Sequence, residues 1–120
     1  MEKLTPQEEE LMLIIWQKGG GIVRDFIPLM QNPKTPYTTA ASIVKNLQHK
    51  QYVNSEKYGN TWVYTPQISE NDYKAVFMSG FINNYFENSY KEMVSFFAKK
   101  QKISAKELQE IIQLIENDDE

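Results

Sequence analysis

The 120-residue chain contains no cysteine and a single histidine, His49. Without cysteine, disulfide bonds, thiol nucleophiles and thiolate metal sites are excluded, and the composition fits a reducing compartment. His49 has no second histidine or cysteine to complete a metal site or a catalytic pair, so a surface position or a phosphate contact is the better interpretation. We therefore expect no enzyme activity, no metal and no cofactor.

Long apolar stretches are also missing. No run approaches the roughly 20 residues that cross a bilayer, and the N-terminal sequence MEKLTPQEEE contains no apolar signal segment. Hydrophobic residues make up 41% and charged residues 24%, which is typical of a folded globular protein. We expect a cytoplasmic protein with no membrane insertion.

Arginine is nearly absent, with Arg24 alone, and the formal net charge is −3. The charge is nevertheless uneven, because residues 34–66 carry four lysines and one glutamate, while the segments before and after them are acidic. A local positive face is what counts for phosphate contact, since charges beyond about 10 Å are largely screened at cellular salt. The basic segment is therefore the candidate for binding nucleic acid.

Two helices are expected before the basic segment. The sequence TPQE at residues 5–8 is a capping box with proline at the first helical position, and it predicts a helix over residues 5–18. Gly19–Gly21 ends this helix, because no preceding strand and no following Gly-Lys-Ser/Thr indicate a phosphate loop. Ile22–Met30 predicts a short second helix that is kinked at Pro28 or begins late.

The basic segment itself predicts a helix that is capped by Thr35 or by Thr38 and ends at Gln51. Its apolar residues follow the three-and-four spacing of a buried stripe, namely Ala40, Ile43, Val44 and Leu47. The outward face is small, polar and nearly free of acid: Thr39, Ala41, Ser42, Lys45 and Asn46. Such a face can enter the major groove of DNA.

A β-hairpin is expected after this helix. Two alternating stretches rich in β-branched and aromatic residues, Tyr52–Lys57 and Thr61–Thr65, are joined by a tight turn at Gly59-Asn60. Trp62 and Tyr64 could stack on bases, but alternation puts them on one face, where we expect one or the other to belong to the core. Beside a helix in the groove, this hairpin would form a wing on the DNA backbone.

Residues 68–120 predict a helical tail. Ser69 caps a helix that continues from Tyr73 to about Ala98 with one glycine as its only breaker. A capping box at residues 104–107 begins a last amphipathic helix. The acidic end, residues 116–120, is expected to be frayed and solvated.

The tail carries more large apolar side chains than two helices can enclose. Left uncovered, they would form a larger patch than soluble monomers usually tolerate, so a second copy of the tail around a two-fold axis is the simplest partner. The candidate dimerisation residues are Phe77, Phe81, Ile82, Tyr85, Phe86, Met93, Leu108, Ile111, Ile112 and Ile115.

With these motifs the chain resembles the penicillinase-repressor family of winged helix-turn-helix regulators, which includes β-lactamase, methicillin-resistance and copper-responsive repressors. The motifs are Leu4-Thr5-x-x-Glu8, Ile15-Trp16, Tyr37-Thr38-Thr39, Leu47-x-x-Lys50, Gly59-x-x-x-Val63-Tyr64-x-Pro66 and Ser69-x-x-x-Tyr73. The resulting expectation is a mainly α fold with a small β-hairpin. It comprises a winged-helix DNA-binding domain in residues 1–67 and a helical dimerisation domain in residues 68–120.

The resemblance implies a homodimeric repressor that occupies a short inverted repeat in double-stranded promoter DNA. It places the third helix in the groove and the hairpin tip on the flanking backbone. The candidate DNA-binding residues are Thr38, Thr39, Ser42, Lys45, Asn46, His49, Lys57 and Asn60.

In β-lactam-responsive members, a membrane sensor triggers cleavage of the repressor before a Phe-Ala-Lys segment of the tail. The resemblance thus implies a scissile bond between Phe96 and Phe97 here, and a signalling protease as a partner. The chain departs from the family pattern at three positions: Phe96 replaces asparagine, Gln51 replaces the glycine that usually ends the third helix, and Asn60 replaces a wing arginine. The change at Asn60 should weaken a phosphate contact.

Two other kinds of protein fit the same sequence. The acidic total charge and the scarcity of arginine also suit a dimeric winged-helix module that binds protein and no DNA. A small helical adaptor without a regulatory role is a further alternative. Binding to promoter DNA would separate the repressor from both.

Overall fold

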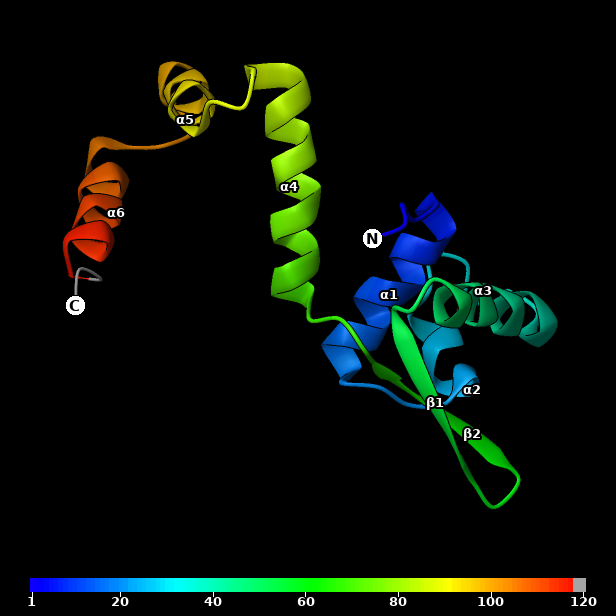
Figure 1. The fold of residues 1–120 in the computed structure, drawn as a ribbon. Helices are drawn as coiled ribbons and strands as arrows, with labels where there is room; N and C mark the ends of the chain where they lie inside the picture. The colour runs from blue at the N-terminus through cyan, green and yellow to red at the C-terminus, as the bar shows by residue number, and fades with distance from the viewer. Residues whose placement is uncertain (118–120) are drawn as a thin grey trace. The chain divides into compact units, whose positions relative to one another are not determined.

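Helices make up most of residues 1–117, the part of the chain that the computed structural model describes, and two antiparallel strands form its sheet. This confirms the expected fold, mainly α with a small β-hairpin. The chain divides into two units, Met1–Lys74 and Ala75–Glu120 (Figure 1).

Helix α1, Pro6–Lys18, begins as the sequence predicts. The Thr5 hydroxyl accepts a hydrogen bond from the Glu8 N–H at 3.2 Å, and the Glu8 carboxylate accepts one from the Thr5 N–H at 2.9 Å. This reciprocal capping box satisfies two backbone donors at the helix start. Gly19 ends the helix in the left-handed region with φ 77°.

Pro28 interrupts the helix expected over Ile22–Met30, but the helix ends early and does not begin late. The single-turn helix α2, Val23–Phe26, gives way to a 3₁₀ turn, η1, at Ile27–Leu29. Proline lacks an N–H and clashes with the carbonyl one turn back, so the α-helix stops before it.

Helix α3, Tyr37–His49, follows Pro36, whose extended backbone leads into the first turn without any side-chain cap. The prediction that Thr35 or Thr38 caps this helix is therefore wrong. The Thr35 hydroxyl instead donates to the Asn32 carbonyl at 2.6 Å in the preceding loop. The fixed φ of Pro36 sets the direction of entry, so a capping side chain is not needed for that purpose.

The end of α3 lies where the sequence places it. Gln51 has φ 68°, a left-handed conformation that glycine adopts at lower cost. Across this turn the Tyr52 N–H donates to the Leu47 carbonyl at 2.9 Å. Gln51 thus adopts a backbone conformation in which glycine is the usual residue.

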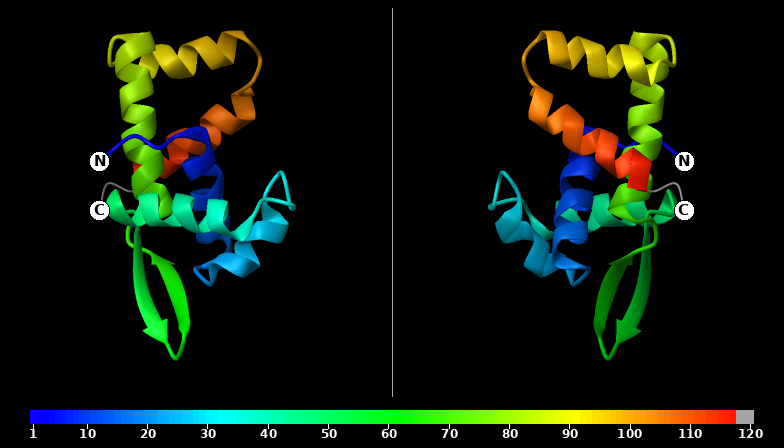
Figure 2. Two further views of the ribbon diagram at one scale, coloured as in Figure 1. Left: turned by 90° about the vertical axis from the view of Figure 1, so that its right-hand side faces the viewer. Right: turned by 90° about the vertical axis from the view of Figure 1, so that its left-hand side faces the viewer.

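The predicted hairpin is formed by β1, Val53–Tyr58, and β2, Thr61–Pro66. Gly21 adds a short bridge at its base, donating to and accepting from Tyr64 at 2.8 Å in both directions. A Cβ on Gly20 would lie 2.7 Å from the Tyr64 carbonyl oxygen, so this close approach requires glycine. Beyond this base the hairpin extends away from the helices of its unit (Figure 2).

The core of the first unit is formed by side chains from α1, α2, α3 and the base of the hairpin. All four members of the predicted α3 stripe are among them. The buried residues are Leu4, Leu11, Met12, Ile14, Ile15, Val23, Phe26, Met30, Ala40, Ile43, Val44, Leu47, Tyr52, Val53 and Tyr64.

Tyr73, in the first turn of the next helix, packs with this unit. Its ring centroid lies 5.3 Å from that of Trp16 and 5.9 Å from that of Tyr52. Its hydroxyl donates to the Glu9 carboxylate at 2.8 Å, and the Trp16 indole N–H donates to the Ile68 carbonyl at 2.8 Å. The N-terminal unit therefore extends past the hairpin.

Between residues 68 and 117 the structure has three helices: α4, Glu70–Phe86; α5, Tyr90–Lys99; and α6, Ala105–Asn117. The prediction of one helix from Tyr73 to Ala98 is therefore wrong.

The break between α4 and α5 has a local cause. Glu87 and Asn88 adopt left-handed φ values of 51° and 63°, and Ser89 caps α5 by accepting from the Glu92 N–H at 3.1 Å. Asparagine tolerates the left-handed region and serine favours a cap, so these two residues together end one helix and begin another. Gly80, the one glycine of this stretch, lies inside α4 and does not interrupt it, as expected.

The other predicted caps of the tail are confirmed. The Ser69 hydroxyl accepts from the Asp72 N–H at 3.0 Å. Ser104 and Glu107 form a reciprocal capping box with distances of 2.9 and 3.1 Å. Helix α6 includes residues 116 and 117, so these two are helical and not frayed, while residues 118–120 of the acidic end lie outside the described part.

Candidate nucleic-acid interface

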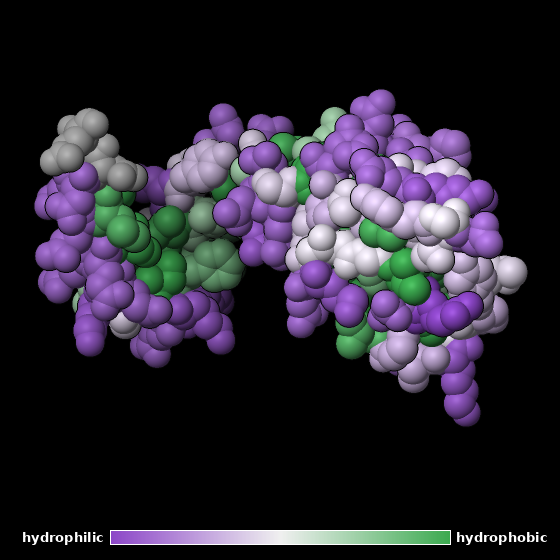
Figure 3. Space-filling model, turned by 90° about the horizontal axis from the view of Figure 1, so that it is seen from below, coloured by the Kyte–Doolittle hydropathy of each residue, from purple (hydrophilic) through white to green (hydrophobic). Residues whose placement is uncertain are grey.

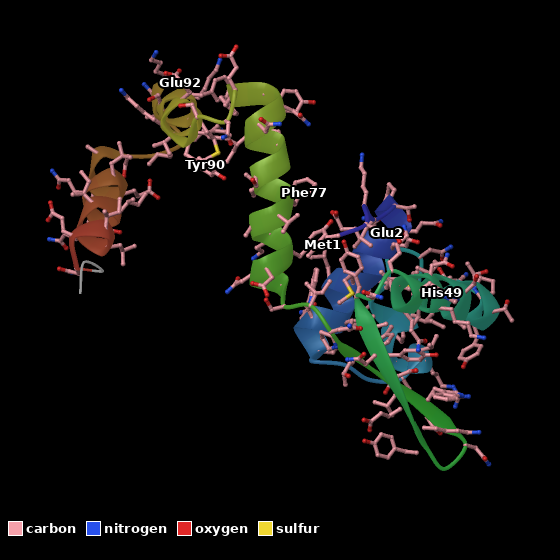
Figure 4. The ribbon with its side chains drawn as sticks, viewed as in Figure 1. Met1, Glu2, His49, Phe77, Tyr90 and Glu92 are labelled. Carbon is pink, nitrogen blue, oxygen red and sulfur yellow. The ribbon has the colours of Figure 1, made fainter. Side chains whose placement is uncertain are left out.

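The outer face of α3 is polar, and α3 contains no acidic residue. The buried stripe fixes this helix on the core and so determines which side chains point outward. All six predicted contact residues on it are exposed, namely Thr38, Thr39, Ser42, Lys45, Asn46 and His49. Figure 4 labels His49 on this helix. The face thus offers hydroxyl, amide and ammonium groups of the kind that contact base edges and phosphates.

Lys50, directly after α3, is engaged inside the protein. Its ammonium lies 2.6 Å from the Glu8 carboxylate and donates to the Lys3 carbonyl at 2.9 Å. The Tyr52 hydroxyl donates to the Glu2 carbonyl beside it. These contacts tie the N-terminal segment to the end of α3, so Lys50 contributes to positioning the helix and not to its outward charge.

The Glu8 carboxylate is in an environment that favours its charged form. Burial raises the pKa of Glu8, but the hydrogen bond from Lys50, the hydrogen bonds from Thr5 and the Lys50 charge together outweigh burial. The pKa of Glu8 is therefore lowered, and the carboxylate stays ionised at neutral pH.

The wing carries a cation and an aromatic side chain opposite each other. Lys57 on β1 is paired with Trp62 on β2, and its ammonium lies 5.7 Å from the centre of the indole ring. This distance permits a cation–π interaction, which steadies both side chains. Lys57 and the predicted tip residue Asn60 are exposed.

The other face of the wing is acidic. The Tyr58 hydroxyl donates to the Glu56 carboxylate at 2.7 Å, and this hydrogen bond, with the negative charge of Glu56, raises the pKa of Tyr58. Because neighbouring residues of a strand point to opposite faces, Glu56 and Tyr58 lie opposite Lys57. The wing therefore presents its positive charge on one face only.

Of the two aromatic residues predicted for one face of β2, only Tyr64 joins the core. Tyr64 is 7% exposed, whereas Trp62 is 49% exposed. They share a face by alternation, but the core covers only the base of the hairpin, and Trp62 lies nearer the tip. Trp62 is therefore available for a ligand.

A groove of about 520 Å³ lies between α3 and the wing. The Gln48 amide on α3 donates to the Ser55 hydroxyl on β1 at 2.8 Å and links its two walls. Arg24 on α2 and Lys45 on α3 supply positive charge to the groove. The groove thus has one positively charged side chain on each of these two helices.

The candidate dimerisation residues differ in exposure. Ile82 is 1% exposed and is the only buried residue between 75 and 117, so it packs inside its own chain. The others are exposed or half-buried, including Phe77 on α4 (Figure 4). Apolar side chains gather beside a polar rim in this part of the chain (Figure 3).

The candidate scissile bond lies inside α5. Phe96 is 46% exposed and Phe97 is half-buried. The Phe96 ring lies 5.7 Å from that of Phe86 and 5.3 Å from that of Phe97, measured between centroids. A bond in a helix reaches a protease only when the helix opens locally.

A model of the penicillinase repressor family matches residues 4–117. The chain belongs to the penicillinase repressor family. It is 29% identical to the penicillinase repressor of Bacillus licheniformis, over 95% of this chain and 90% of that protein. It is 26% identical to the penicillinase repressor of Staphylococcus aureus, over 91% of this chain and 87% of that protein. It is also 25% identical to the methicillin resistance regulatory protein MecI of Staphylococcus aureus strain N315, over 91% of this chain and 89% of that protein.

Membership of the penicillinase repressor family places the chain among transcriptional repressors. Within residues 1–117, no helix is long and apolar enough to span a membrane. In the same residues, no three His, Asp or Glu side chains are grouped so that they could hold a metal ion.

Sequence reasoning missed several residues of the interface in this family member. Arg24, Gln48 and Ser55 line the groove and were not assigned to it from the sequence. Arg24 could have been found, because Val23 and Phe26 on the same helix are apolar and turn it outward. The Gln48–Ser55 hydrogen bond could not have been predicted from the sequence, since it depends on how the hairpin packs against α3.

Proposed function

We propose that the chain is a homodimeric repressor that binds an inverted repeat in double-stranded promoter DNA. The observation that carries the proposal is the acid-free, exposed face of α3, held on the core beside a wing with one positive face. Thr38, Thr39, Ser42 and Asn46 would contact base edges, and Lys45 a phosphate. His49, Lys57 and Asn60 would contact the flanking backbone.

In this proposal residues 1–67 bind DNA and residues 68–120 dimerise. The exposed apolar side chains of α4, α5 and α6 support a second copy as the partner, because a large uncovered patch is costly in a monomer. With few cations per copy, one winged helix binds weakly. Two copies joined by the tail would occupy half-sites about one helical turn apart, and the second contact becomes effectively intramolecular.

Relief of repression by proteolysis fits the same arrangement. Cleavage between Phe96 and Phe97, set off by a membrane sensor and carried out by a signalling protease, would split α5 and release α6. The released segment includes Leu108, Ile111 and Ile115, part of the proposed dimer contact. Cleavage would therefore weaken the dimer and with it the binding to DNA.

The test is a fluorescence anisotropy titration of the full chain with promoter DNA from its own operon at several salt concentrations. We expect the logarithm of the binding constant to fall linearly with the logarithm of salt, by about 0.9 per phosphate neutralised. Lys45→Gln should reduce the slope by about one such unit. Lys106→Gln in α6 removes the same charge outside the interface and should leave it unchanged.

Absence of binding by the wild-type dimer at low salt would overturn the repressor proposal. That outcome would favour a winged-helix module that binds another protein. An equal effect of both lysine substitutions would argue for nonspecific attraction and against a contact through α3.

A further inference from the structure

The groove between α3 and the wing has walls of a distinct chemistry. None of the twelve described residues that line it is acidic. Two of them, Arg24 and Lys45, are cations, and three, Tyr37, Trp62 and Tyr64, are aromatic. Positive charge next to aromatic rings is the combination with which proteins hold a nucleic-acid strand, the cations on its phosphates and the rings on its sugars or bases.

Arg24 reaches this groove from α2, a different element from the recognition helix α3. Its neighbours Val23 and Phe26 are buried, so the exposed Arg24 side chain points away from the core. Among the described residues Arg24 makes no ion pair. A guanidinium offers five donors in a fixed plane and suits a phosphate better than an ammonium does.

Trp62 lies on the same face of the wing as Ser55 and Tyr64, which also line the groove. Nearly half of its surface is exposed, and Lys57 holds its ring from the neighbouring strand at 5.7 Å. An indole held in this way offers a flat apolar surface that is already ordered before a ligand arrives.

We propose that this groove holds a stretch of one DNA strand, with a phosphate bound by Arg24 and the adjoining deoxyribose packed on Trp62. The inference rests on the proposed DNA-binding function and adds two backbone contacts, from α2 and from the wing, to those made by α3.

The test uses the full chain and the same promoter DNA. Arg24→Gln should lower the salt slope by about 0.9, and Arg24→Lys should keep the slope while weakening binding. Trp62→Ala should weaken binding about tenfold with an unchanged slope, because stacking is apolar and releases no counterion. Tyr58→Ala removes an exposed aromatic ring from the opposite face of the wing and should leave affinity within about twofold.

A second readout follows Trp62 directly. In Trp16→Phe, Trp62 is the only tryptophan, and DNA should protect its fluorescence from iodide quenching. Circular dichroism checks that each variant is folded.

If wild-type protein binds DNA but Arg24→Gln keeps its slope and Trp62 stays open to iodide, the groove proposal is overturned and the repressor proposal stands. If the wild-type protein does not bind, both are overturned. Equal losses from Trp62→Ala and Tyr58→Ala would also contradict the groove, because they would show an effect on the wing as a whole.

Discussion

The two units of this chain differ in how they bury apolar surface. The first unit encloses fifteen hydrophobic residues in one core. In the second, Ile82 alone is buried among residues 75–117, while α6 exposes Ile111, Ile112, Leu114 and Ile115 by 43 to 68%. The units also differ in what they leave outside: polar groups on α3 and the wing, and apolar groups on the tail.

This difference teaches how the two parts obtain their stability. A core of this kind lets the first unit fold by its own contacts, because burying a large apolar side chain contributes about 1.5–3 kcal/mol. The tail has amphipathic helices whose apolar faces have few partners in the same chain, so helix formation there depends on packing against something else. Both tryptophans, Trp16 and Trp62, lie in the first unit, and their fluorescence reports its unfolding separately.

The largest effect is expected where the tail is uncovered. Ile112→Asp with Ile115→Asp places two charges on the apolar face of α6, and it removes only part of the packing within the single chain, since these residues are 50 and 65% exposed. A charge buried in an interface without a partner is strongly unfavourable. We expect dimer dissociation to become at least about 100-fold easier, a difference of near 3 kcal/mol, measured by light scattering across protein concentrations.

The matched control is Gln109→Asp with Gln113→Asp, which adds two charges to the polar side of the same helix. It should leave the oligomeric state unchanged. A wild-type chain that stays monomeric at high concentration would break the contrast between the units altogether.

A smaller effect is expected from the ion pair inside the first unit. Glu8→Gln removes the charge that faces Lys50, whose side chain is 20% exposed while that of Glu8 is 6% exposed. We expect the free energy of unfolding at pH 7 to fall by about 1–2 kcal/mol, between the values for surface and buried pairs. Urea titration followed by tryptophan fluorescence measures it.

The stabilisation by the Glu8–Lys50 pair should depend on pH. Because the pKa of Glu8 is lowered on folding, its stabilisation is complete above the ordinary value of 4.5 and is lost as pH falls through the lowered pKa. The difference between wild type and Glu8→Gln should therefore shrink in acid. The exposed pair Lys74–Glu70, at 3.6 Å on α4, is the comparison, and Glu70→Gln should cost less than about 0.5 kcal/mol. Equal costs for both pairs would contradict a special role for Glu8.

The smallest effect concerns the helix ends. Gln51 in the first unit and Gln101 in the tail both have left-handed backbones, with φ 68° and 60°. Replacing Gln51 by Gly relieves this strain and should raise the free energy of unfolding of the first unit by about 0.5–1 kcal/mol. Gln101→Gly should leave the tryptophan-detected transition unchanged, because residue 101 belongs to the other unit. A loss of stability in Gln51→Gly would show that the Gln51 side chain makes up for the strain.

Local chemistry in the sequence predicted much of the first unit. The capping box at Thr5 and Glu8, the interruption at Pro28 and the α3 stripe all follow from contacts within a few residues, and the structure confirms them. The cap of α3 was predicted wrongly because Pro36 sets the helix entry through its backbone. The single tail helix was predicted wrongly because the left-handed residues Glu87 and Asn88 carry no strong breaker signal.

The candidate interface, too, could be predicted from the sequence only in part. The outward residues of α3 could be read from helical spacing, which requires only that one face be buried. The sequence could not show that Arg24 and Trp62 line the same groove. This depends on how α2, α3 and the wing meet, which is decided by the core and by the Gln48–Ser55 hydrogen bond.

By itself, the sequence determined the helices that begin with a capping box, the amphipathic stripes, the hairpin and the uneven charge, because each depends on residues close together in the chain. Only the tertiary structure decided that Lys50 is engaged by Glu8, that Trp62 stays exposed while Tyr64 is buried, and that Arg24 reaches the groove. These depend on the distance between residues that are remote in sequence, and that distance is set by how the core packs.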